Sequence, residues 1–233
     1  MSEPCADGVD LDAKAFARDA KTLATFLRLR SPGTLFLGSG SAGEGLPPVP
    51  HAPEVRIHTD EIFQSTGPIF DGLSYHFYPG VSKRCMPPDR AMTAEKALAA
   101  TWFERNLTVE RFFAEQRDRF LLGKPLWVTE TAEAACGGDP LASQFADSLR
   151  LLDQLGSLAQ SGVKSVMINA LAASDYGLID GDTLEPRPDY WAAVIWKRTK
   201  GSRSCGRLKV LRVDYGPTRN APETGRALSP FSF

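Results

Sequence analysis

The sequence has almost no excess of charge and no long apolar run. Its 27 Lys and Arg residues nearly balance its 28 Asp and Glu residues, for a formal net charge of −1. This balance does not predict nucleic acid as a partner. No segment approaches the roughly 18 apolar residues of a membrane helix, and the N-terminus shows no basic-then-apolar signal peptide. We therefore expect no membrane partner, and the sequence leaves the localisation unknown.

Metal-binding and phosphate-binding motifs are missing as well. The four cysteines (Cys5, Cys85, Cys136 and Cys205) form no C-x-x-C pair, and no histidine stands at zinc-ligand spacing from them. The glycine-rich run at residues 38–45 lacks the Lys-Ser/Thr pair of a phosphate-binding loop. This run is more typical of a loop between a strand and a helix, and the sequence does not predict a zinc site.

The cysteines leave two alternatives open. Cys5, Cys85 and Cys136 each follow a predicted strand end, so a disulfide could join two of these loops in an oxidising compartment. Free, partly buried thiols are the other alternative, because an even number of cysteines does not decide between them.

What the sequence does contain is an alternation of strand and helix patterns. With 42% hydrophobic residues, 233 residues are enough for a soluble domain with a sizeable core. Apolar patterns predict a helix from Asp10, its N-cap, to about residue 29, and one long helix, or two joined near Asn106, over 93–119. Strands are predicted at 34–38, 72–78, 125–130 and 165–171, with further helices at 59–64, 140–160 and 188–196. This order favours parallel βα units.

One carboxylate stands at the end of an apolar strand. Residues 125–129 are apolar, β-branched or aromatic, and Glu130 follows them directly. An isolated buried carboxylate costs several kcal/mol, so this Glu needs either a partner or a chemical role. The spacing alone leaves open a catalytic Glu and a Glu that caps a helix or forms a salt bridge.

The order of segments after Glu130 resembles glycoside hydrolase family 79, which holds heparanase and β-glucuronidases. A glycine pair, a Leu-rich helix, a strand and the run A-S-D-Y-G-L-I-D at 173–180 follow in turn. The resemblance covers residues 2–201 and implies that Glu130 is the catalytic nucleophile. It also implies that Glu3, in Ser2-Glu3-Pro4, is the acid/base residue of an Asn-Glu-Pro motif whose Asn is replaced by Ser2.

The resemblance also implies a substrate. It indicates a glycoside or oligosaccharide with a β-linked glucuronide, cleaved with retention by two carboxylates about 5–5.5 Å apart and without a metal or organic cofactor. Full-length relatives are typically secreted. Glycine N–H groups and phenols suit the carboxylate of a uronic acid, because no Cβ blocks the glycine backbone. The residues expected to bind the sugar are His76, Tyr78, Gly137, Gly138, Tyr176 and Gly177.

The length predicts only part of a barrel. A (β/α)8 TIM barrel takes about 250 residues, whereas about four βα units follow Glu3. We expect residues 1–201 to form the C-terminal half of such a barrel and residues 202–233 to form a basic, irregular tail. Open sheet edges would make this chain oligomeric, or dependent on a missing N-terminal half-barrel. The alternative to an enzyme is a non-catalytic half-barrel remnant that at most binds carbohydrate.

Overall fold

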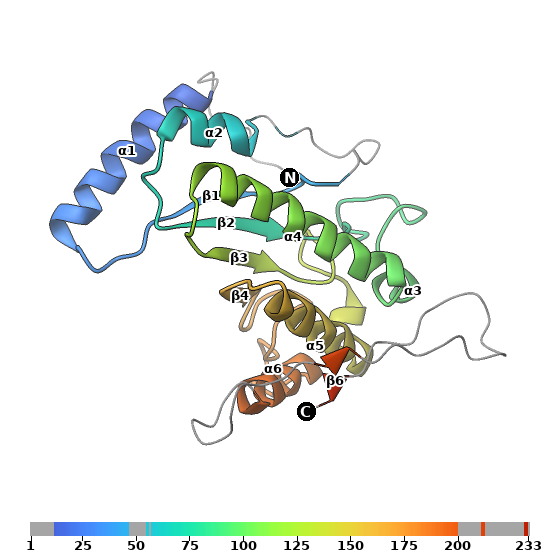
Figure 1. Ribbon diagram of the computed structural model, residues 1–233. Helices are drawn as coiled ribbons and strands as arrows, with labels where there is room; N and C mark the ends of the chain where they lie inside the picture. Colours follow the sequence, from blue (N-terminus) through green and yellow to red (C-terminus); the bar gives the residue numbers. More distant parts are fainter. Residues whose placement is uncertain (1–11, 47–54, 56, 200–210, 213–230, 233) are drawn as a thin grey trace.

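Four parallel strands form one sheet in the order β1-β2-β3-β4. The computed structural model describes residues 12–46, 55, 57–199, 211–212 and 231–232. Helices connect the strands (Figure 1), as expected of a partial (β/α)8 barrel. In chain order the elements are α1 (Ala13–Arg30), β1 (Leu37–Ser41), α2 (Thr59–Thr66), β2 (Gly72–Phe77), α3 (Ala94–Ala97), α4 (Ala100–Phe120), β3 (Leu126–Thr131), the 3-10 helix η1 (Pro140–Ser143), α5 (Phe145–Gln160), β4 (Ser165–Ile168), α6 (Pro188–Thr199), β5 (Leu211–Arg212) and β6 (Phe231–Ser232).

The main core lies between the sheet and α4, which crosses one face of it in Figure 1. Tyr75 of β2 stacks on Phe113 of α4 with ring centroids 4.4 Å apart, and Phe77 meets the edge of Trp102 at 5.5 Å. Side chains alternate between the two faces of a strand. His76, between these two aromatic residues, is therefore directed away from the helices.

A register shift near the strand ends positions the site. Tyr75 pairs with Val128, but the next residue, His76, pairs with Glu130, so β3 carries one extra residue at Thr129. An inserted residue of this kind bends a strand and redirects the side chains after it. It brings Glu130 level with His76 at the carboxyl edge of the sheet.

The first strand lies further along the chain than predicted. The prediction was 34–38, whereas β1 spans Leu37–Ser41 and includes part of the glycine-rich run that was expected to be a loop. Thr34 N donates to Ser31 O in a turn that delays the strand. At Gly38 a Cβ would lie 2.3 Å from the Phe70 ring, so glycine is required for the strand to pack there.

The long helical segment divides at a different place from the one predicted. Thr93 caps α3 by accepting from Lys96 N at 3.3 Å, and the extended backbone of Ala99 starts α4. Asn106 does not interrupt α4, because its side chain donates to Ser157 Oγ of α5 at 3.3 Å instead of competing for its own backbone.

The remaining boundaries agree in part. Asp10 lies outside the described residues, and Asp12 is the N-cap of α1, accepting from Ala15 N at 2.7 Å. β4 stops at Ile168 rather than at residue 171, because Ala170 O and Leu171 O accept hydrogen bonds from the returning loop. Of the predicted tail, only the short antiparallel pair β5–β6 is described.

Both outer strands of the sheet have an edge without a strand partner among the described residues. Large apolar side chains are exposed on α1 (Phe26, Leu29), β4 (Met167) and α6 (Trp191). No described helix is both long and apolar enough to cross a membrane.

Candidate active site

Two neighbouring strands bring three predicted site residues together. Tyr78, just after β2, donates its hydroxyl to Glu130 Oε2 at 2.9 Å, and His76 Nδ1 lies 3.4 Å from the same oxygen. The Glu130 side chain is 43% exposed. The carboxylate is therefore fixed through one oxygen and still open to a ligand.

Asn169, which the sequence analysis did not identify, extends this network. It follows β4 and donates Nδ2 to the Tyr78 hydroxyl at 2.8 Å, with the Tyr176 hydroxyl 3.5 Å away. An amide nitrogen only donates, so the Tyr78 oxygen accepts here and its proton goes to Glu130. Burial raises the pKa of Tyr78, and the hydrogen bond to Glu130 raises it further, so Tyr78 stays a neutral donor. The sequence feature that could have identified Asn169 is a polar residue at the end of an apolar strand.

The glycine pair lies in a left-handed turn after β3. Cys136, Gly137 and Gly138 have φ of 62°, 78° and 70°. At Gly138 a Cβ would lie 2.8 Å from both Glu133 Oε1 and Tyr176 Cδ1. Positive φ and this close packing both require glycine at position 138.

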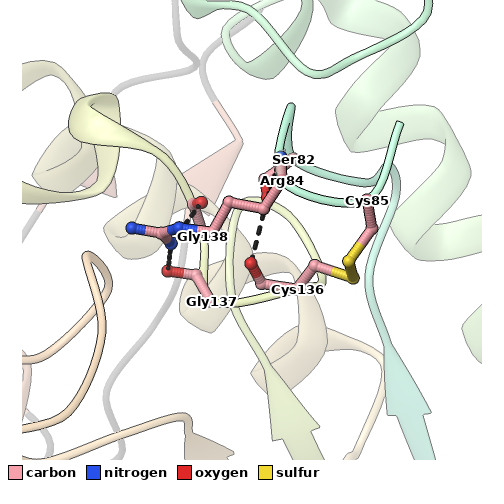
Figure 2. Close-up of a disulfide and its surroundings, with 6 residues drawn as sticks. All are labelled: Ser82, Arg84, Cys85, Cys136, Gly137 and Gly138. Atoms are coloured by element: carbon pink, nitrogen blue, oxygen red, sulfur yellow. Dashed lines mark hydrogen bonds between the residues drawn. A yellow bond between two sulfur atoms is a disulfide. The ribbon is translucent and has the colours of Figure 1, made fainter. Parts of the chain in front are cut away.

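The loop after β2 holds the carbonyl groups of this turn (Figure 2). Arg84 donates Nη1 to Gly137 O at 2.7 Å and to Gly138 O at 3.0 Å, and Ser82 Oγ donates to Cys136 O at 3.0 Å. Arg84 Nη2 also donates to Asp175 Oδ2, in the loop after β4, at 2.7 Å. One guanidinium group thus contacts the loops that follow β3 and β4.

A disulfide joins the same two loops, between Cys85 and Cys136, with Cα atoms 6.2 Å apart (Figure 2). For Cys85 and Cys136 the structure therefore contains a disulfide, the first of the two alternatives, and not free thiols. Cys5 and Cys205 lie outside the described residues.

A buried charged cluster lies beneath the turn. Arg150 pairs with Asp147 and lies over the Trp102 ring at 4.9 Å. Burial and the nearby Asp147 raise the pKa of Glu133 to about 7 and that of Asp189 to about 9. Glu133 Oε1 accepts from Asp139 N at 2.9 Å, which attaches the cluster to the end of the glycine turn. No sequence pattern indicated this cluster, because Asp147 and Arg150 lie on what the apolar pattern predicted to be an amphipathic helix.

The other predicted residues are placed as follows. Tyr176 packs against Gly138. Gly177 lies in a tight loop, where its N–H donates to Ser174 O at 3.4 Å. Glu3 lies outside the described residues, so its distance to Glu130 stays a prediction.

A hollow between α1 and α2 contains none of the predicted site residues. Within the described residues, no three His, Cys, Asp or Glu side chains lie close enough together for a metal ion.

Comparison with known sequences finds heparanases. Mouse (Mus musculus) heparanase is 32% identical over 156 residues, which is 66% of this chain and 27% of the relative. The hyaluronoglucuronidase of Hirudo nipponia is 39% identical over 100 residues, 42% of this chain and 19% of the relative. A mouse protein named inactive heparanase-2 is 28% identical over 107 residues, 46% of this chain and 17% of the relative. The chain thus spans about a quarter or less of these relatives' length, and no protein-family model matches it.

Solved structures support the fold. A GH39 enzyme from Xanthomonas axonopodis pv. citri superimposes with a TM-score of 0.55 at 13% identity, over 80% of this chain and 37% of that one. A 4-O-α-L-rhamnosyl-β-D-glucuronidase from Fusarium oxysporum gives 0.54 at 14%, over 81% of this chain and 38% of that one. These similarities agree with a partial α/β barrel. The sequence identities show that the chain is a relative of the heparanases of glycoside hydrolase family 79.

Proposed function

We propose that the chain carries the nucleophile half of a retaining glycoside hydrolase that acts on β-linked glucuronides. The observation that carries this proposal is Glu130, which ends a parallel strand, is partly exposed, and is held by Tyr78 and His76. Active sites of α/β barrels collect at this edge of the sheet. In this proposal, residues 1–201 are half of the barrel and residues 202–233 are an appended basic tail.

The proposed reaction has two steps. A carboxylate of Glu130 attacks the anomeric carbon while an acid, Glu3 in our prediction, protonates the departing oxygen. Water then hydrolyses the glycosyl ester, and Glu130 leaves as a carboxylate. Tyr78 holds one carboxylate oxygen through its hydrogen bond, which leaves the other oxygen for the sugar.

The glycine turn supports an acidic sugar as the substrate. Among the described residues, no group accepts a hydrogen bond from the N–H groups of Cys136, Gly137 or Gly138. Backbone N–H groups gathered in a turn bind anions. The uronate carboxylate is the anion that a glucuronide would present to them.

The test is Glu130→Gln, assayed on an aryl β-glucuronide with the 233-residue chain. We expect turnover to disappear, because an amide cannot form the glycosyl ester. The matched control is Glu104→Gln, the same substitution at an exposed position of α4, which should keep wild-type turnover. Near-normal turnover by Glu130→Gln would reject the assignment.

A second candidate is a carbohydrate-binding protein without turnover. It is favoured by the similarity to the relative named inactive heparanase-2. Binding of a glucuronide, unchanged by Glu130→Gln and without product release, would support this candidate over the enzyme.

A further inference from the structure

We propose that Arg84 is a positioning residue that sets the preference for an acidic sugar over a neutral one. It would do so by fixing the direction of the backbone N–H groups in the turn at residues 136–138. This inference rests on the proposed function, and adds to it the group that makes the turn selective.

The Arg84 guanidinium contacts three acceptor groups at once. Its Nη1 donates to the carbonyls of both glycines, at 2.7 and 3.0 Å, while Nη2 donates to Asp175 at 2.7 Å. These bonds come from one planar guanidinium group, whose donors have a fixed mutual orientation. Arg84 can therefore hold two successive peptide carbonyls and a carboxylate at once, which a lysine ammonium cannot do in the same geometry.

The planar peptide groups of the turn link each carbonyl direction to an N–H direction. In a trans peptide, the N–H of one residue points away from the carbonyl of the residue before it. Because Arg84 holds Gly137 O, the Gly138 N–H faces the side opposite to Arg84. In the same way Ser82, by donating to Cys136 O, turns the Gly137 N–H away from its own loop.

Groups other than Arg84 also hold parts of the turn. Gly138 O also accepts from Arg84, and the N–H of the same peptide, that of Asp139, donates to Glu133 Oε1. The disulfide and Ser82 hold Cys136 at the start of the turn. Gly137 O also accepts from Asp175 N at 3.0 Å, but the Asp175 side chain is itself paired with Arg84. Loss of Arg84 should therefore loosen the two glycine peptides while the start of the turn stays in place.

The sign of the charge agrees with this arrangement. Asp175 pairs with Arg84 at 2.7 Å, so the guanidinium is largely neutralised on the loop side. Its contribution to anion binding would come from orienting the N–H groups, not from a long-range positive field. Removing a positive charge elsewhere on the protein should then leave the preference for the acidic sugar unaltered.

The experiment measures the dissociation constants of p-nitrophenyl β-D-glucuronide and of the matching glucoside. It uses the full chain with Glu130→Gln as the common background, so that neither ligand is consumed. Adding Arg84→Ala should lower the preference for the glucuronide about tenfold, the cost of one charge-assisted hydrogen bond, with glucoside affinity unchanged. Arg84→Lys should lose a smaller part of the preference.

The matched control is Arg90→Ala. Arg90 lies in the same connection between β2 and α3, is exposed, and its Nε lies 3.7 Å from Asp89. This variant removes the same charge without touching the turn, so it should retain the full preference. A loss as large as that of Arg84→Ala would contradict positioning and indicate a general charge effect.

The amide NMR signals of Gly137 and Gly138 separate the two proposals. We expect Arg84→Ala to shift both signals in the absence of ligand. If the alanine variant does not fold, Arg84→Lys takes its place and should shift the two signals by a smaller amount. Unchanged glycine signals together with a retained preference would overturn the role of Arg84. If Arg84→Ala shifts the signals but the Glu130→Gln background binds the glucoside as tightly as the glucuronide, the proposed substrate is overturned instead.

Discussion

Glu133 is a fully buried acid only three residues beyond the candidate nucleophile. One of its oxygens accepts from Asp139 N, and the other has no hydrogen-bond partner among the described residues. Burial, with the charge of Asp147, raises its pKa from about 4.5 to about 7. Between these two values the folded protein keeps a proton that the unfolded chain releases. Stability should therefore fall as the pH rises through this window, and the Glu133 contribution should stay constant above it.

Glu133→Gln should remove this pH dependence. At pH 8 we expect the variant to unfold with a free energy about 1–3 kcal/mol higher than wild type, because no buried charge has to form. At pH 4.5 the difference should be much smaller. Denaturant unfolding at both pH values measures it, with the exposed Glu104→Gln as the control. An equal difference at both pH values would contradict the assigned pKa.

The strand-end position of Glu130 could be predicted from the sequence, because a short apolar strand has a clear end. Its hydrogen bond with Tyr78, 52 residues away, was not predicted, because the family resemblance indicated only that Tyr78 would bind the sugar. Arg84 and Asn169 were missed for a physical reason. Their partners are 53 to 91 residues distant in the chain, and no local periodicity records such contacts.

At the scale of elements, the sheet order was predictable and the strand limits were less so. Alternating strand and helix patterns predicted the four parallel strands, which the structure contains. The limits of β1 depended on the packing of Phe70 against Gly38, a tertiary contact that overrides the poor strand propensity of glycine. The break between α3 and α4 lies at Leu98 and Ala99, where the backbone leaves the helical conformation, and not at Asn106.

The Cys85–Cys136 disulfide should stabilise the loops at the carboxyl edge. It closes a segment with a sequence separation of 51 residues, and such a cross-link contributes about 2–4 kcal/mol by restricting the unfolded chain. We expect the double variant Cys85→Ser with Cys136→Ser to lose this amount in denaturant unfolding. Reductant should lower the stability of wild type but not of the double variant. A variant as stable as the oxidised wild type would show that the cross-link contributes nothing.

At the scale of the whole molecule, the uncovered edges of the sheet should promote self-association. Met167 is exposed on β4, and unpaired strand edges associate with other chains. We expect the average mass of the 233-residue chain to rise with concentration in sedimentation velocity. Met167→Lys, on β4 with 43% exposure, should reduce this rise.

Leu122→Lys is the control for the edge. Leu122 is more exposed than Met167 but lies in the turn between α4 and β3, on neither outer strand. Equal effects of the two lysine variants would indicate a general gain in solubility and would argue against an edge-specific contact.

The disulfide has a further consequence for the connectivity of the chain. With the backbone between its two cysteines, it closes a covalent ring that contains α3, α4 and β3, and the turn at Leu122 lies on that ring. A protease that cuts this turn opens the ring without separating the pieces. His76 and Tyr78 would then belong to one fragment and Glu130 to the other, still joined through sulfur. A nicked molecule should migrate as a single band without reductant and as two bands with it, and only the reduced form could exchange one half of its site for that of another molecule.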